Sequence, residues 1–170
     1  MEIRAARSRD LNPLGGKPGL MTLFEQMHKR SKYARHAVDV KYLREFLISH
    51  IVFNAKKPMI GAVRVFVADV DGAIVGFVIA GAERLYNIGV DLMVSDIFFY
   101  VSAGGPASAA EKLWSAVEEW SAVPYVAFVR PTVTDAISDW TRTASFFKRR
   151  GYKQIGGMFE SPVRTTRSVA

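Results

Sequence analysis

The sequence contains no cysteine among its 170 residues. This absence excludes disulfide bonds, thiolate metal sites and a cysteine nucleophile. The three histidines, His28, His36 and His50, fall in one region that is expected to be helical, and they lack the spacing of a zinc site. We therefore interpret them as surface or core residues and expect no metal site.

Long apolar runs are also missing. No stretch approaches the ~20 apolar residues that span a bilayer, and the charged N-terminus lacks the apolar core of an export signal. We therefore expect a cytoplasmic protein. What is present fits one globular domain, because 49% of the residues are hydrophobic and the mean hydropathy is +0.09.

Acidic residues are scarce relative to basic ones, with 16 Asp and Glu against 23 Lys and Arg, which gives a net charge of +7. Such a balance favours an anionic cofactor, nucleic acid or an acidic partner. Nucleic acid is the least favoured of these, because aromatic residues scarcely alternate with the charges. Solvated surfaces also explain the two basic clusters, which are Lys29, Arg30, Lys32 and Arg35, and Lys148, Arg149, Arg150 and Lys153.

Hydrophobic periodicity predicts the element order β, α, α, β, β, β, α, β, α, β, β. Asp39 is the expected N-cap of the second helix, Asp71-Gly72 the expected hairpin turn, and Gly151 the expected end of the last helix. We expect a single domain over residues 1–163 and a polar C-terminal tail over residues 164–170. The predicted strands are residues 1–7, 63–68, 74–80, 92–101, 125–129, 152–155 and 158–161.

The pattern of the chain centres on residues 93–120, where an apolar strand is expected to turn through Ala-Gly-Gly-Pro into an amphipathic helix. Free backbone N–H groups and the positive end of the helix dipole suit an anion such as a phosphate. The alternative is an ordinary strand-to-helix turn. Within the strand, Asp96 is a carboxylate in apolar surroundings, so it is either paired, with Arg64 or Arg84, or functional.

Three stretches resemble the GNAT superfamily of acyl-CoA-dependent N-acyltransferases: residues 67–77, residues 96–120 and residues 141–152. The resemblance implies an α+β fold layered α/β/α, with a mixed, mostly antiparallel central sheet, helices on both faces and a splayed strand pair. It also implies an acetyl-CoA cofactor and an unknown amine acceptor, which is a small molecule or a protein. Trp120 is similar to a residue of small bacterial and phage members, which keeps a phage origin open.

The resemblance also assigns roles to individual residues. Asp96 becomes the candidate general base. Loop N–H groups would hold the pyrophosphate, and the strand end would face the pantetheine arm. The residues expected to bind the cofactor are Phe99, Tyr100, Val101, Ala103, Gly104, Gly105, Ala107, Ser108, Arg142 and Phe147.

The sequence departs from the family pattern at two places. The corner lacks the usual Arg or Gln, and Pro106 removes one backbone donor. Phe147 stands where many members have a general-acid tyrosine. We therefore keep a second hypothesis, a catalytically inactive GNAT-fold protein that binds a protein partner, such as a phage or host regulatory or assembly factor. Association into a homodimer, which is common in this fold, stays open.

Overall fold

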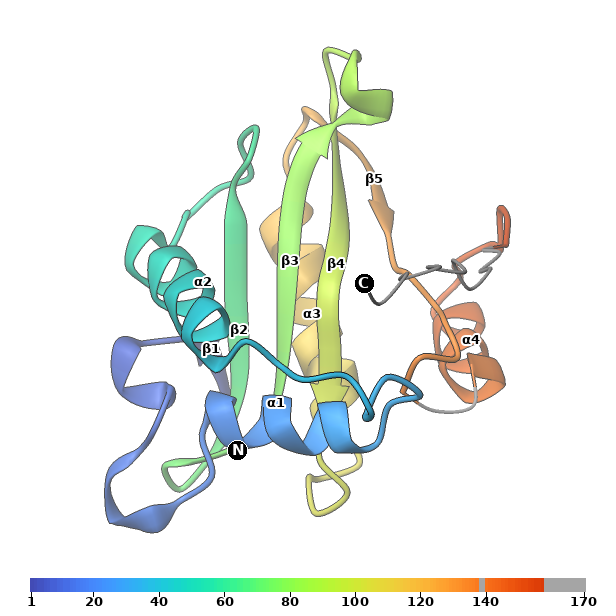
Figure 1. Cartoon of the computed structure of the whole chain (residues 1–170). Coiled ribbons are helices and arrows are strands. Elements are labelled where there is room, and N and C mark those ends of the chain that lie inside the picture. The colour runs from blue at the N-terminus through green and yellow to red at the C-terminus, as the bar shows by residue number, and fades with distance from the viewer. Residues whose placement is uncertain (138–139, 158–170) are drawn as a thin grey trace, which may run out of the picture.

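The computed structural model describes residues 1–137 and 140–157 (Figure 1). Its centre is one five-stranded sheet in the order β1-β2-β3-β4-β5. Neighbouring strands are antiparallel except β4 and β5, which are parallel. The strands are β1 (Glu2–Ala5), β2 (Val63–Val70), β3 (Ala73–Arg84), β4 (Leu92–Val101) and β5 (Val126–Arg130).

Helices cover both faces of the sheet. Helices α1 (Leu20–Lys29) and α2 (Val40–Phe53) lie on one face, α3 (Ala109–Ser121) lies on the other, and α4 (Trp140–Arg149) stands beyond β5 (Figure 1). Short 3-10 turns occur at Ser8–Asp10, Leu14–Gly16 and Leu85–Asn87. The α+β class and the mixed, mostly antiparallel sheet predicted from the sequence are therefore confirmed.

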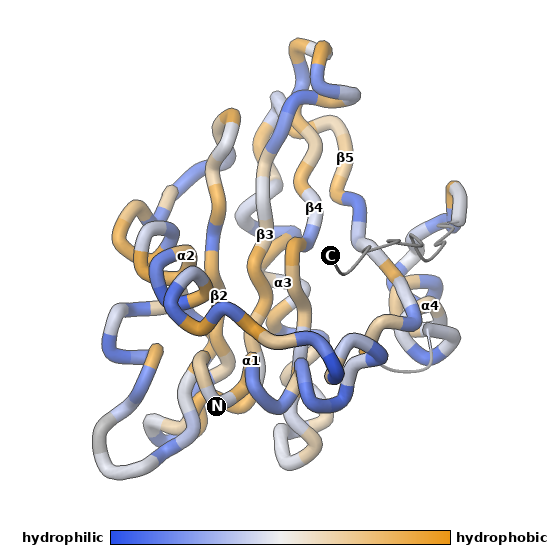
Figure 2. Tube along the Cα trace, in the orientation of Figure 1, coloured by the Kyte–Doolittle hydropathy of each residue, from blue (hydrophilic) through white to orange (hydrophobic). Residues whose placement is uncertain are grey.

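The sheet separates two apolar cores, and apolar residues follow its central strands (Figure 2). On the α3 side, Leu113, Trp114 and Val117 are fully buried against β2, β3 and β4. On the other side, Leu20 and Leu47 pack against inward-facing residues of β2 and β3. Successive side chains along the strands point alternately into the two cores, as expected for a sheet that is covered on both faces.

A helix cap, a hairpin turn and a helix end predicted from the sequence are confirmed. Asp39 caps α2, because its carboxylate accepts a hydrogen bond from the Tyr42 N–H at 2.9 Å. Asp71 and Gly72 both have positive φ in the hairpin between β2 and β3. Gly151 has a φ of +88° two residues after the end of α4, a conformation that glycine adopts without steric cost.

One predicted strand is wrong. Residues 152–155 form no strand, because Tyr152 turns back onto α3, where its hydroxyl donates to Glu118 at 2.8 Å. The other predicted C-terminal strand, residues 158–161, and the predicted tail, residues 164–170, lie outside the described residues. None of the described helices is long and apolar enough to cross a membrane.

Candidate active site

The parallel strands β4 and β5 separate halfway along β4 (Figure 1). Their pairing runs from Leu92 opposite Val126 to Ser95 opposite Arg130. Strand β5 then ends and Pro131 leads the chain away, while β4 continues to Val101. The second half of β4 therefore has backbone groups that β5 does not pair with, and Asp96 is the first residue past the separation.

A β-bulge lies at the same point. Asp96 pairs with Ala80 and Phe98 pairs with Ile79, so Ile97 is an extra residue on β4. A bulge re-aims the side chains that follow it. Beyond it, Phe98 packs towards α1 and α2, whereas Phe99 packs towards α3.

Asp96 is half-buried and has no cationic partner among the described residues. Of the two alternatives for Asp96, pairing with an arginine is not formed, because Arg64 donates to the carbonyls of residues 54 and 55 and Arg84 donates to that of Gly89. One carboxylate oxygen of Asp96 instead accepts a hydrogen bond from the backbone N–H of Thr132 at 2.6 Å. Burial raises the pKa of Asp96 to about 6, so this carboxylate can exchange a proton near neutral pH.

Asp96 opens into a cleft of about 1810 Å³. The cleft runs from α1, α2 and the segment between them, across the second half of β4, to the start of α3 and one side of α4. It is much larger than a site for a single small metabolite, which supports a long ligand or two ligands side by side.

The corner between β4 and α3 closes one end of this cleft. Ser102 fixes it to β3, because both its N–H and its hydroxyl donate to the Val75 carbonyl. Gly105 is required there, since a Cβ atom would lie 2.9 Å from a Val101 methyl group and 3.2 Å from two backbone oxygens. The corner is therefore a tight, anchored turn rather than a loose loop.

The corner presents unpaired backbone donors. In the described part of the chain, no acceptor is bound by the N–H groups of Ala107, Ser108 and Ala110, which are at the start of α3. These groups and the helix dipole suit an anion. Pro106 contributes no donor, but its carbonyl accepts from Ala109 at 2.8 Å and starts the helix. The predicted anion corner therefore retains donors in spite of the proline.

Helix α4 supplies the opposite wall. Arg142, Phe146 and Arg149 line the cleft, and they lie on one side of the helix because of their spacing of three and four residues. Phe147 faces away from the cleft: it is only 4% exposed, and its ring centroid is 4.8 Å from that of Trp114. Its place is thus in the core, which explains the absence of a hydroxyl at this position.

The structure brings most of the predicted site residues together. Eight of them line the cleft: Asp96, Phe99, Tyr100, Val101, Ala103, Gly105, Ala107 and Arg142. Gly104, Ser108 and Phe147 do not line it. Tyr100 is almost fully buried beside Phe77, which agrees with a packing role for its ring.

Sequence reasoning missed two groups of lining residues. Arg149 could have been found from its helical spacing to Arg142. The segment between α1 and α2 could not, because only the folded chain brings it to the loop after β5, where Lys32 contacts Asp135 and Ala136.

No protein-family model matches the chain, and no curated protein is significantly similar to it in sequence. Solved structures do match. A structure described as a possible acetyltransferase from Clostridium difficile 630 has 15% identity and a TM-score of 0.66, with 95% of this chain and 97% of that chain covered.

Two further matches are complexes with small molecules. An aminoglycoside acetyltransferase from an uncultured soil metagenomic sample, in complex with sisomicin, has 16% identity and a TM-score of 0.62 over 96% of both chains. AAC(6')-Iy in complex with a CoA-containing bisubstrate analogue has 16% identity and a TM-score of 0.63, over 96% of this chain and 97% of that chain. Together with the strand order and the separated pair β4 and β5, these matches show that the chain has the fold of the GNAT superfamily of acetyltransferases.

Proposed function

We propose that this protein is an acyl-CoA-dependent N-acetyltransferase that modifies an amine. The observation that carries the proposal is the position of Asp96. Its unpaired carboxylate lies where β4 and β5 separate, inside a cleft that ends at an anchored anion corner. A proton acceptor and an anion site in one long cleft match the needs of acyl transfer from an anionic donor to an amine.

The residues present fit acyl-CoA. Gly105 keeps the corner open to a close approach, and the free N–H groups of Ala107 and Ala110, which line the cleft, would donate to phosphate oxygens. Arg142 and Arg149 would face the remaining phosphates from α4. The edge of β4 beyond Ser95, which β5 does not pair with, would form backbone hydrogen bonds with the amide groups of the pantetheine arm, as it would with a neighbouring strand.

When bound, acyl-CoA supplies a thioester, whose C–S bond breaks as the amine nitrogen forms the new amide bond and CoA leaves as its thiol. Asp96 takes the proton that the amine must lose. The Thr132 N–H holds this carboxylate in place, and the partly buried environment keeps its pKa near neutrality. Phe147 has no proton to donate and faces away from the cleft, so a leaving thiolate would have to take its proton from water.

Acetyl-CoA titration by calorimetry, followed by an assay of thiol release with a panel of amines, tests the proposal. We expect saturable binding and amine-dependent thiol release, and a loss of release with unchanged acetyl-CoA binding in Asp96→Asn. Asp91→Asn is the matched control, because Asp91 is exposed and lies just before the same strand, outside the cleft. No binding at millimolar acetyl-CoA would contradict the proposal.

The second candidate function is a GNAT-fold protein that binds a partner without catalysis. The burial of Phe147 and the missing donor at Pro106 support it. Acetyl-CoA binding without thiol release for any amine tested, together with capture of a specific protein partner, would favour this function over the first.

A further inference from the structure

We infer that the amine acceptor is a small molecule with an apolar, ring-sized body and a single amino group. The inference rests on the proposed function, because it concerns the end of the same cleft that an acyl donor at α3 and α4 would leave free. That end is formed by α1, the connecting segment (residues 30–38) and the first half of α2. Asp96 also lines the cleft, and its strand β4 lies between α1 and α4 (Figure 1).

The free end is lined mainly by aromatic and aliphatic side chains, which we call the acceptor wall. Its rings pack against one another: Phe24 meets Phe98 edge to face with centroids 5.2 Å apart, and Tyr42 stacks on Phe46 at 6.5 Å. Apolar surface is left uncovered, because Tyr42 is 66% exposed and Val40 is 60% exposed. Such a surface favours an apolar ligand body. The acceptor wall comprises Phe24, Tyr33, Val40, Tyr42, Phe46 and Phe98.

The charges at this end oppose a polycation. Glu25 is paired with Lys29 at 2.6 Å, and the Asp39 carboxylate caps α2. Glu111, at the other end of the cleft, is paired with Arg150. Among the described residues that line the cleft, Asp96 is then the carboxylate that neither pairs with a cation nor caps a helix, and the exposed Arg30 adds positive charge. An acceptor with several ammonium groups would need several free carboxylates, so a single amine fits better.

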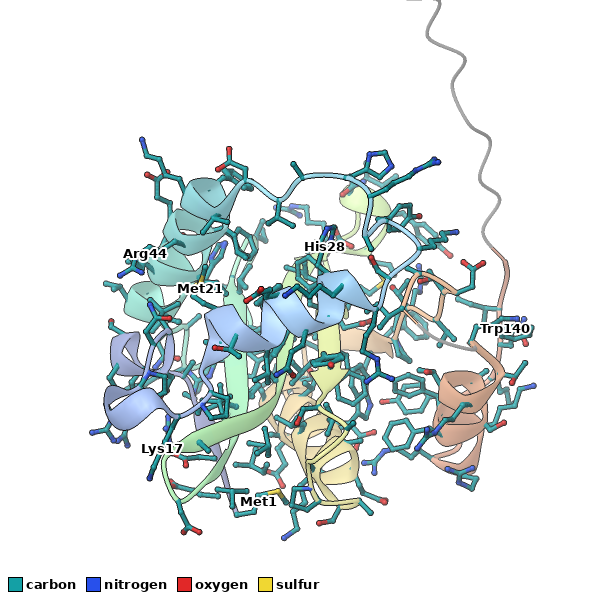
Figure 3. All side chains as sticks on the ribbon, turned by 60° about the horizontal axis from the view of Figure 1, so that its bottom comes forward. Met1, Lys17, Met21, His28, Arg44 and Trp140 are labelled. Carbon is teal, nitrogen blue, oxygen red and sulfur yellow. The ribbon has the colours of Figure 1, made fainter. Side chains whose placement is uncertain are left out.

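The connecting segment limits the size of the acceptor. It is fixed to α1 by a hydrogen bond from the His28 Nε2 to the His36 carbonyl at 2.8 Å, and Figure 3 shows His28 on the side of α1 that faces this segment. Lys32 ties it to the loop after β5, with its N–H on the Ala136 carbonyl and its ammonium on Asp135, both at 2.9 Å. The segment thus bridges the cleft beside β4, which favours a small molecule over a folded protein.

The test compares three acceptors with acetyl-CoA in the thiol-release assay: phenethylamine, the polycation sisomicin and a short peptide with a free N-terminus. We expect the highest kcat/KM for phenethylamine. Calorimetry of phenethylamine on the protein with CoA adds a readout that does not depend on turnover. A higher kcat/KM for sisomicin or for the peptide would overturn the inference.

Two variants probe the acceptor wall directly. Tyr42→Ala should raise the KM and the Kd for phenethylamine about fivefold through loss of one ring contact, with little change in kcat. Val40→Glu should weaken the binding of phenethylamine and strengthen the binding of sisomicin. This variant is compatible with folding, because Val40 is exposed in the first turn of α2, where a negative charge suits the helix dipole. Tyr86→Ala is the matched control, since Tyr86 is 74% exposed and outside the cleft.

The outcomes separate the two proposals. If acetyl-CoA does not bind, the proposed function fails and the inference fails with it. If acetyl-CoA binds but phenethylamine neither binds nor reacts, the inference alone is wrong. Equal effects of Tyr42→Ala and Tyr86→Ala on phenethylamine would also contradict it.

Discussion

At the scale of single residues, Asp96 is a carboxylate held in an unfavourable place. Burial raises its pKa from 3.8 to about 6, and the hydrogen bond from Thr132 offsets only part of this effect. No cation of the described chain compensates for it. A group that costs stability without a structural partner is expected at a functional site.

Replacing Asp96 should therefore stabilise the fold at neutral pH. The folded state binds the Asp96 proton more tightly than the unfolded state, so the destabilisation is absent below about pH 3.8 and is fully present above about pH 6. Each pKa unit corresponds to about 1.4 kcal/mol, so Asp96→Asn should gain at most about 3 kcal/mol at pH 7. Urea unfolding of both proteins at pH 4 and pH 7 measures this. An equal gain in the free energy of unfolding at both pH values would show that burial of the ionised carboxylate is not the cause of the destabilisation.

Phe147→Tyr should not restore a general acid. The new hydroxyl would be buried near Trp114 instead of reaching the cleft, and an unsatisfied buried hydroxyl costs about 1–3 kcal/mol. We expect a lower free energy of unfolding and no increase in kcat. Phe146→Tyr, on the side of α4 that lines the cleft, is the comparison. An increase in kcat for Phe147→Tyr would show that this side chain reaches the reacting groups.

At the scale of elements, the site depends on how β4 leaves the sheet and enters α3. The bulge at Ile97, the end of β5 at Arg130 and the anchored corner at Gly105 all lie within this one strand–turn–helix unit and its neighbour. The tight corner fixes where the free N–H groups of α3 point. A larger side chain in the corner should therefore act mainly by weakening the binding of the anionic acyl donor.

Gly105→Ala should weaken acetyl-CoA binding and lower the melting temperature. Its Cβ would lie 3.2 Å from the Ser102 and Val75 carbonyl oxygens, which are backbone atoms and cannot move independently. Overpacking of this kind costs about 1–3 kcal/mol. Gly104→Ala is the matched control, because nothing lies within 4 Å of its added Cβ. The same loss of affinity in both variants would contradict the steric argument.

At the scale of the whole molecule, the net charge of +7 should assist the binding of an anionic donor. Arg142 and Arg149 face the cleft, whereas Arg150, directly after the same helix, is paired with Glu111 and Glu118. Exposed charges are screened by salt. The contribution of these charges to donor binding can therefore be tested by measuring affinity at different ionic strengths.

Raising the salt concentration from about 0.1 M to about 1 M shortens the Debye length from about 10 Å to about 3 Å. We expect the Kd for acetyl-CoA to rise about tenfold over this range, and the uncharged pantetheine arm alone to bind independently of salt. Calorimetry at several salt concentrations provides the measurement. Arg142→Gln should reduce the salt dependence; an unchanged slope would exclude Arg142 as a phosphate contact.

Much of the fold could be predicted from the sequence, because alternating and helical apolar patterns encode which face of each element is buried. Asp96 was recognisable for a similar reason, as a charge inside an apolar strand. That Asp96 lacks an arginine partner was not predictable, since Arg64 and Arg84 donate to backbone carbonyls that come close only after folding.

The acceptor end was equally hidden. It depends on the contact between Lys32 and the loop at Asp135, which are far apart in the sequence. The strand predicted at residues 152–155 failed because the pattern could not show that Tyr152 bonds to Trp114 and Glu118 on α3. Long-range polar contacts, and not local propensity, determine the structure of these two segments.

The pH dependence of thiol release with acetyl-CoA and a saturating amine tests the central claim most directly. If Asp96 is the base, kcat should rise with pH through about 6 in the wild-type protein, where Asp96 loses its proton. Asp96→Asn should lower kcat about 100-fold or more and abolish this step. A wild-type rate and pH profile retained in Asp96→Asn would contradict the account.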